Sequence, residues 1–554
     1  MPTRSASIRF ALGLSIAIPV LATPSLAQSL IPAPTPTFAT SDTVIRRMWR
    51  VGMQESKVET LAQVLIDSIG PRLSGTSGFQ SSVEWLERTY RGFGVPVRRH
   101  QYGTWRGWQQ GATSAELIGP RHQNLEVELL AWSPGTPRSQ PVDGDVVAIP
   151  ALADTAAASA WIGTLRGKFV LISAPEIMCR APQELARNAS RAVAVQIDSQ
   201  RAQVRRLAAD RFRALAPAGS TPQNFTRAVH LRLDSAGVAG IVTTNWSNGW
   251  GVNKIFGATA PRVPTVDLSC EDYGLLHRLA SNNQGPRMRL TADSRTAPAE
   301  VPMFNVIAEL KGRELPNEYV VLSAHLDSWH GATGATDNGT GTITMLEAMR
   351  ILKETYPNPR RTIVVGHWGS EEQGLNGSRS FVEDHPQVID GLQAAFNQDN
   401  GTWRFETIEG QGFAKSGEHL GRWISMLPAV MSDSIKLQVP GPQANAGSDH
   451  SAFICKGAPA FRLQSPYDEY RQYTWHTNRD TYDKVVLPDL RNNATIAAMM
   501  AYAASEDPER LPRDKVTLYL PNGQPRAWPT CSTPQRTSTS YFNPPTTPPP
   551  PDER

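Results

Sequence analysis

The feature that most constrains the fold is a regular alternation of short apolar runs and amphipathic stretches, which begins near residue 305. The apolar runs predict strands over Asn305–Leu310, Tyr319–Ala324, Thr362–Trp368, Ala394–Phe396 and Ala460–Leu463. The amphipathic stretches predict helices over Thr340–Glu354, Ser378–Glu383, His419–Met426 and Leu487–Ala504. Strands that alternate with crossover helices are typical of a parallel sheet covered by helices. We therefore predict an α/β fold with a mixed, largely parallel central sheet.

The chain is longer than one typical domain, at 554 residues. Between residues 140 and 298 the pattern changes to short strands and loops, which predicts a β-rich domain inserted into the main one. The main domain then comprises residues 44–139 and 299–506. A Pro- and Thr-rich tail follows over 507–554, and its final run of prolines is typical of disorder.

The N-terminus has the features of an export signal. Two arginines, an apolar stretch from Phe10 to Ala22 and the small-residue site Ser25–Ala27 predict a signal peptide over 1–27, followed by a linker over 28–43. The apolar stretch is shorter than the roughly 20 residues that span a bilayer, so we expect no stable membrane insertion. A secreted or periplasmic location follows. The net charge of +4 is too small to indicate a nucleic-acid partner.

Export makes disulfides possible among the four cysteines. They are Cys179, Cys270, Cys455 and Cys531. Four cysteines allow three pairings, and their spacing does not choose among these. Because Cys179 and Cys270 both fall in the predicted insertion, that pair is slightly favoured.

Acidic residues and histidines follow three of the predicted strands directly. In open α/β sheets, ligands bind at the carboxyl ends of the strands, so these residues should meet at one rim. Two further residues of these types precede the next helix or lie in a later loop. The set is His325, Asp337, Glu372, Asp399 and His476, with Asp327 and Glu371 beside it.

Imidazole and carboxylate side chains of this kind suit zinc, and a shared carboxylate can hold two ions roughly 3.5–4 Å apart. Asp337 is the natural bridge, which leaves one histidine and one further carboxylate for each ion. Glu371, next to a predicted ligand, is placed to act as general base. Asp327, two residues after His325, is expected to orient that imidazole.

The order of these motifs resembles the co-catalytic zinc aminopeptidase and glutamate carboxypeptidase family. The motifs are His325–Ser328, Asp337–Gly341, Glu371–Ser378, Asp399 and His476–Thr477. The resemblance implies a phosphorylase/hydrolase-like zinc exopeptidase fold, two zinc ions per chain, and ligand and base roles at the positions given above. It also implies that residues 140–298 form a protease-associated domain, and it makes a homodimer plausible.

Other residues have weaker support. The loop around Asp449 and His450 is similar to a Ser-Asp-His loop of the family, so Asp449 is expected to hydrogen-bond near the ligands and His450 to face substrate; the alternative is a packing role. Trp475 stands where glutamate carboxypeptidase II has a tyrosine before its last zinc histidine. Tyr470 and Tyr473 are alternative oxyanion donors or parts of the substrate wall.

The resemblance implies a peptide substrate and leaves the cleaved terminus open among aminopeptidase, dipeptidase and carboxypeptidase activities. A glutaminyl cyclase, which uses one zinc ion, and a receptor-like protein without catalysis are rival functions. Both are disfavoured because none of the five predicted ligands is missing.

Overall fold

The computed structural model describes residues 40–222 and 224–542. The predicted signal peptide, all but the end of the predicted linker and the final run of prolines lie outside the described residues. The first described helix is α1 (Thr43–Trp49), whose N-terminal amides donate to the Asp42 carboxylate.

The central sheet of the main domain is mixed, with parallel strands at its centre. Its strands are β8 (Arg287–Leu310), β9 (Leu315–His325), β10 (Arg361–Trp368), β11 (Leu392–Asn397), β12 (Thr407–Glu409), β13 (Lys436–Gln438) and β14 (Ala460–Gln464). They lie in the order β13-β12-β14-β11-β9-β10-β8. The pairs β10–β9, β9–β11 and β11–β14 are parallel, whereas β8 and β12 run antiparallel to their neighbours β10 and β14. Each predicted strand lies within one of these elements, and the predicted fold class is confirmed.

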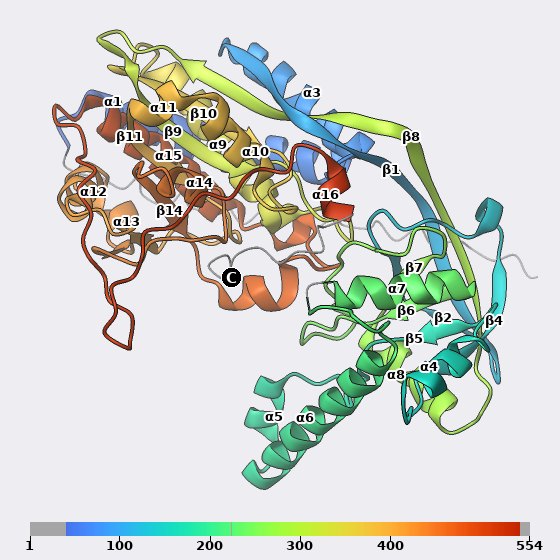
Figure 1. The fold of residues 1–554 in the computed structure, drawn as a ribbon. Coiled ribbons are helices and arrows are strands. Elements are labelled where there is room, and N and C mark those ends of the chain that lie inside the picture. The colour runs from blue at the N-terminus through green and yellow to red at the C-terminus, as the bar shows by residue number, and fades with distance from the viewer. Residues whose placement is uncertain (1–39, 223, 543–554) are drawn as a thin grey trace, which may run out of the picture. The chain divides into compact units, whose positions relative to one another are not determined.

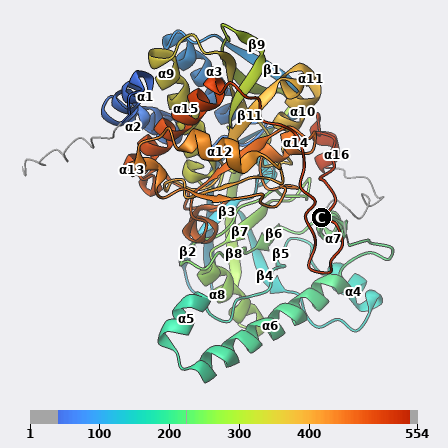
Figure 2. The same ribbon diagram turned by 90° about the vertical axis from the view of Figure 1, so that its left-hand side faces the viewer.

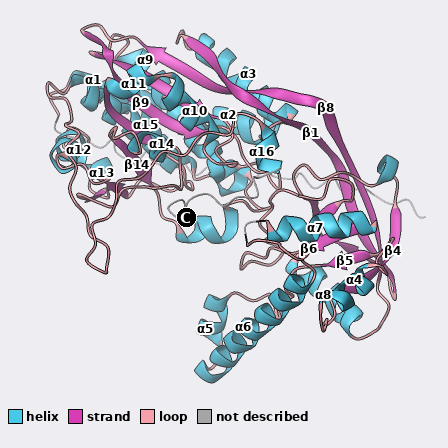
Figure 3. Cartoon of the chain, in the orientation of Figure 1, coloured by secondary structure: helices cyan, strands magenta, loops and turns pink. Residues whose placement is uncertain are grey.

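Helices cover this sheet, as Figure 3 shows. They include α2 (Val58–Gln63), α3 (Ser77–Gly92), α9 (Thr340–Thr355), α10 (Asn376–Asp384), α11 (Pro386–Asp390), α12 (Ser416–Ile424), α13 (Ala429–Ser432), α14 (His450–Ile454) and α15 (Leu487–Glu506). The α9 and α15 helices pack on each other and are buried around almost their whole circumference. The N-terminal helices α1 and α2 also pack on α9 and α15, which explains why α9 and α15 lack a polar face.

A ribbon of two long antiparallel strands leads from this sheet into the insertion (Figure 1). It pairs β1 (Val97–Gly119) with β8, and its register shifts at several points along the length. Strand β2 (Gln123–Leu125) pairs with the end of β1. Because β8 is continuous from 287 to 310, the predicted domain boundary at 298 falls inside a strand.

The strands of the insertion continue the same sheet beyond β8. Strands β4 (Val142–Ala148), β5 (Phe169–Leu171), β6 (Gly240–Thr243) and β7 (Thr265–Leu268) are parallel, and β3 (Val127–Leu129) pairs antiparallel with β7. Its helices are α4 (Thr155–Ile162), α5 (Pro182–Asn188), α6 (Arg191–Ala214), α7 (Phe225–Ala236) and α8 (Cys270–Ser281).

The insertion is thus richer in helix than the β-rich prediction (Figure 2). Strands β5, β6 and β7 have only three or four residues each, and the helices between them supply much of the core. Val229 and Leu233 of α7, for example, are fully buried in the cluster that covers this sheet. The arginine-rich α6 is largely exposed.

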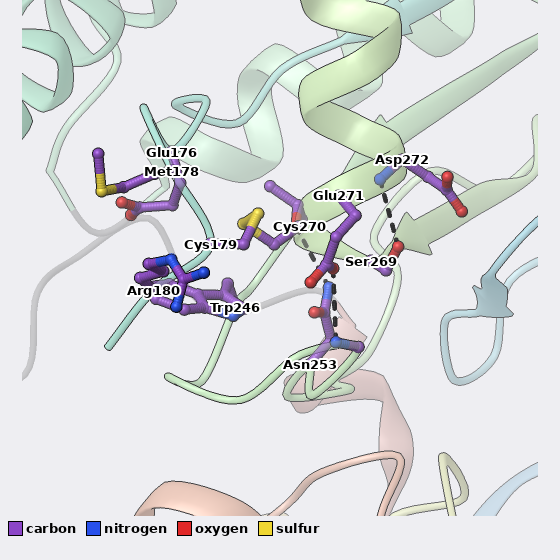
Figure 4. Close-up of a disulfide and its surroundings, with 12 residues drawn as sticks. Glu176, Met178, Cys179, Arg180, Trp246, Asn253, Ser269, Cys270, Glu271 and Asp272 are labelled. Atoms are coloured by element: carbon purple, nitrogen blue, oxygen red, sulfur yellow. Dashed lines mark hydrogen bonds between the residues drawn. A yellow bond between two sulfur atoms is a disulfide. The ribbon is translucent and has the colours of Figure 1, made fainter. Parts of the chain in front are cut away.

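Two disulfides are present among the described residues, which fits an oxidising compartment. Cys179 pairs with Cys270 at the start of α8, as the sequence slightly favoured (Figure 4). Cys455 pairs with Cys531 and links the end of α14 to the C-terminal segment. That segment continues into the short helix α16 (Ser538–Phe542). Among the described residues, no helix has the length and apolar character needed to cross a membrane.

Candidate metal centre and active site

Three parallel strands bring four of the predicted site residues together. His325 is the last residue of β9, Glu371 and Glu372 follow β10, and Asp399 follows β11. Because β10, β9 and β11 are adjacent and parallel, their carboxyl ends form a single rim. His325, Asp399 and Glu372 are buried at this rim, and Glu371 is nearly so.

Asp337 lies in the loop that leads into α9, and a second carboxylate holds its backbone in place. Asp480 accepts hydrogen bonds from the amides of Thr336 (2.8 Å) and Asp337 (3.0 Å). Burial raises the pKa of Asp480 to about 7. His476 reaches the same rim from the loop that follows the short helix Tyr470–Thr474.

The five predicted ligands form two groups that share Asp337. In the first, His325 Nε2 is 3.1 Å from Asp399 Oδ1 and 3.5 Å from Asp337 Oδ1. In the second, His476 Nε2 is 2.9 Å from Glu372 Oε2 and 3.3 Å from Asp337 Oδ2. One oxygen of Asp337 therefore faces each histidine, which is the arrangement that a carboxylate bridging two cations requires.

Glu371 lies against the first group. Its Oε2 is 3.9 Å from His325 Nε2, and the Glu371, His325 and Asp399 ligand atoms all lie within 4.8 Å of one another. Burial raises the pKa of Glu371 well above its usual value, and the charges of Asp399, Asp449 and Glu372 act in the same direction. This carboxylate thus adjoins the rim without being part of the bridge.

Asp327 positions both the histidine and the glutamates. Its backbone carbonyl accepts a hydrogen bond from His325 Nδ1 at 2.9 Å, which leaves Nε2 facing the carboxylates. Its carboxylate accepts hydrogen bonds from the backbone amides of Glu371 at 3.0 Å and Glu372 at 3.3 Å. The side chain is completely buried. The sequence predicted an orienting role towards His325; the structure adds the contact to the glutamate pair.

The site has the chemistry of a cation site. Glu372 Oε1 and Asp337 Oδ2 are buried without a hydrogen-bond partner. Burial raises the pKa of Glu372 well above its usual value, and the Asp337 charge adds to this effect. Although burial acts in the opposite direction, the Asp399 and Glu371 carboxylates raise the pKa of His325 well above its usual value. Bound cations would compensate this excess of buried negative charge.

The residues predicted with weaker support differ in burial and in their contacts. Asp449 is completely buried at the start of α14, and burial raises its pKa to about 7. The neighbouring His450 is buried, and burial lowers its pKa to about 3. Trp475 stacks on His476 with ring centroids 3.8 Å apart, whereas the Tyr473 side chain is exposed. Tyr470 is buried near the same loop.

Sequence reasoning missed three residues that support the site, of which Arg72 and Asp480 are buried and Arg462 is half-buried. Asp480 holds the Asp337 loop, as described above. Arg72 donates hydrogen bonds to the carbonyls of Leu326, Thr333 and Gly334, in the loop between His325 and Asp337. Arg462 of β14 donates to the carbonyl of Asp399. None of the three lies in a motif, and only Arg462 lies in an apolar run of the sequence.

The insertion contacts the loop that carries His476. The Ile255 amide donates to the His476 carbonyl at 2.8 Å, and the Asn478 amide donates to the Asn253 carbonyl at 3.0 Å. Phe256 lies edge-on to the His476 imidazole, with centroids 5.3 Å apart. Loop and insertion thus form one local structure.

Fold, site and comparisons together define a metallo-exopeptidase. Residues 305–501 match the model of Peptidase family M28. The resemblance found in the motifs is thereby confirmed, and zinc is the metal that it implies.

Among known proteins, the chain is similar to carboxypeptidase Q of Homo sapiens, with 25% identity over 467 residues that cover 83% of this chain and 87% of that protein. The crystal structure of a peptidase M28 precursor from Shewanella amazonensis has a TM-score of 0.61 at 22% identity and covers 85% of this chain and 97% of that one. A zinc aminopeptidase from Bacillus subtilis has a TM-score of 0.51 at 18% identity, with 83% and 97% covered. These two structures share the fold.

Proposed function

We propose that this protein is an exported exopeptidase that hydrolyses short peptides with two zinc ions per chain. The observation that carries the proposal is the shared carboxylate, since Asp337 directs one oxygen to each histidine. His325 and Asp399 would hold one ion with Asp337, and Glu372 and His476 would hold the other. Such ions polarise the scissile carbonyl and favour ionisation of water.

Glu371 is the general base in this proposal. Its carboxylate adjoins the rim, and its backbone is held by Asp327. Glu371 accepts a proton from the attacking water, and the protonated side chain then donates it to the nitrogen of the leaving amine. A group with a raised pKa suits the second step, because it keeps the proton until the nitrogen becomes basic.

The experiment is Glu371→Gln, with zinc content measured on the same preparation. Removal of general base catalysis should lower kcat on a dipeptide by about 10²–10⁴-fold, while about two zinc ions per chain are retained. Exposed Glu84→Gln is the matched control and should behave as wild type. Near-normal turnover of Glu371→Gln with zinc bound would exclude the base role. A wild-type protein that binds no zinc after reconstitution would exclude the ligand assignment.

A further inference from the structure

A pocket of about 370 Å³ lies in the insertion beside the candidate metal centre. Its lining includes Ser173, Phe212, His230, Thr243, Lys254 and Phe256. The volume lies within the range of small-ligand pockets. Phe256, which lines this pocket, also touches the His476 imidazole. Through Phe256 the pocket therefore neighbours His476, one of the five predicted ligands.

The pairing of this segment of the insertion with the His476 loop explains why Lys254 and Phe256 face the same way. Lys254 pairs antiparallel with Thr477, next to the hydrogen bond from Ile255 to His476. Side chains alternate along an extended segment, so Lys254 and Phe256 share one face and Ile255 points to the other. Asn253 anchors the segment, because its side-chain amide donates to the Leu268 carbonyl.

Among the described residues, the ammonium group of Lys254 forms no ion pair. No carboxylate of the described residues lies within 4.0 Å of it, and its Nζ sits 4.3 Å from the centre of the Trp475 ring. Asp267, the acid in this pocket, already accepts hydrogen bonds from Asn253 and Thr243. Burial lowers the pKa of Lys254, and the positive charge of Arg471 adds to this effect. A half-buried cation beside a second cation is stabilised when an anion binds.

A second polar group in the pocket lacks a partner. His230 is buried, its Nδ1 lies 2.7 Å from Thr259 Oγ1, and its Nε2 has no hydrogen-bond partner. Burial lowers the pKa of His230 to about 4, so the ring is neutral near pH 7. Buried polar atoms without partners are rare in proteins, and a bound ligand would satisfy this one.

We propose that this pocket binds the part of the peptide on the carboxyl side of the cleaved bond, with Lys254 pairing with a carboxylate of that part. The inference rests on the proposed function and names its substrate class: peptides with a free carboxylate one or two residues beyond the scissile bond. The Lys254 ammonium lies 4.3 Å from the centre of the Trp475 ring, and that ring stacks on the His476 imidazole with centroids 3.8 Å apart. Two extended residues, at about 3.3–3.6 Å each, span that gap.

The test compares Ala-Phe, Ala-Phe-amide and Ala-Glu-amide as substrates. If Lys254 binds the terminal carboxylate, wild type should show a KM about 10–100-fold higher for Ala-Phe-amide than for Ala-Phe. Ala-Glu-amide should then behave like Ala-Phe-amide; if the lysine binds an acidic side chain instead, Ala-Glu-amide should have the low KM. Equal KM values for all three substrates would overturn the proposal, whether or not any variant folds.

Lys254→Met should remove this preference by raising KM for the carboxylate-bearing substrate while leaving the others unchanged. The matched control is Lys515→Met, because Lys515 also lies over a tryptophan, with Nζ 4.1 Å from the Trp528 ring centre. Thr226→Trp, which adds volume at the pocket lining, should raise KM for Ala-Phe more than for Ala-Gly. Variants that keep the wild-type KM values would contradict the assignment.

Calorimetry on the zinc-free protein separates this inference from the proposed function. Wild type should bind Ala-Phe more tightly than Ala-Phe-amide without turnover, and Lys254→Met should bind both equally. Carboxylate-dependent binding with no hydrolysis after zinc addition would refute the proposed function and support the assignment of the pocket as a carboxylate-binding site. Hydrolysis with no preference for a free carboxylate would support the proposed function and refute the pocket assignment.

Discussion

Replacing Asp327 by asparagine should slow the reaction by moving Glu371. The two oxygens of the Asp327 carboxylate accept hydrogen bonds from the backbone amides of Glu371 and Glu372, whereas an asparagine side chain has only one oxygen that can accept. Its NH₂ group then faces an amide that has lost its acceptor. One lost charge-assisted hydrogen bond costs about 1.5–3 kcal/mol. If that cost appears in the transition state, kcat falls by about 10–150-fold.

The assay is kcat on a dipeptide as a function of added zinc, with Asp480→Asn as the comparison. Asp480 also holds two backbone amides, but these belong to Thr336 and the shared ligand Asp337. Asp480→Asn should therefore weaken zinc binding, and excess zinc should restore its activity. The loss in Asp327→Asn should persist at saturating zinc, because the base remains displaced. Wild-type kcat for Asp327→Asn at saturating zinc would refute the positioning role.

Three further predictions concern stability. Arg72→Met leaves several buried carbonyls without a donor and should lower the free energy of unfolding by about 3 kcal/mol or more in urea titrations. Burial lowers the pKa of His367 to about 3, so as pH falls below 6.5 this histidine becomes protonated in the unfolded chain but stays neutral in the folded protein. The free energy of unfolding should therefore fall by about 1.4 kcal/mol between pH 7.5 and 5.5, and by less in His367→Asn. Replacing Cys455 and Cys531 by serine should cost about 2–4 kcal/mol, seen as a lower Tm, with zinc content unchanged.

Periodicity was sufficient to locate five strands of the main domain, whereas β12 and β13, with three residues each, were missed. The prediction over Thr362–Trp368, for instance, lies in β10, a strand that is buried throughout. The elements of the insertion were harder to predict, since a strand of three residues such as β5 is too short to show a periodic pattern. The long pairing of β1 with β8 was also not predicted: its register is fixed by contacts between residues nearly 200 positions apart, which local patterns do not encode.

Four of the predicted metal ligands meet because they lie at strand ends or before a helix, and parallel strands place such positions together. His476 comes from a later loop. The supporting residues follow no such rule. Asp480 was missed because its role depends on where a late loop passes the Asp337 backbone, and Lys254 because the pairing of the insertion with residues 476–478 is tertiary. The predicted ligands and Asp327 lie in sequence motifs and were accessible to sequence reasoning, whereas Asp480 and Lys254 lie outside such motifs.

The insertion is part of the scaffold of the metal centre as well as a neighbour of it. His476 adopts a backbone conformation with φ of +61°, which is uncommon for a residue other than glycine. Its carbonyl accepts the Ile255 amide, and its ring is bordered by Phe256 on one side and Trp475 on another. Contacts from the insertion thus hold the loop in this conformation. A change in the insertion that moved Asn253–Phe256 would move a predicted zinc ligand and the proposed carboxylate-binding lysine together, so metal binding and substrate selection are coupled through one segment.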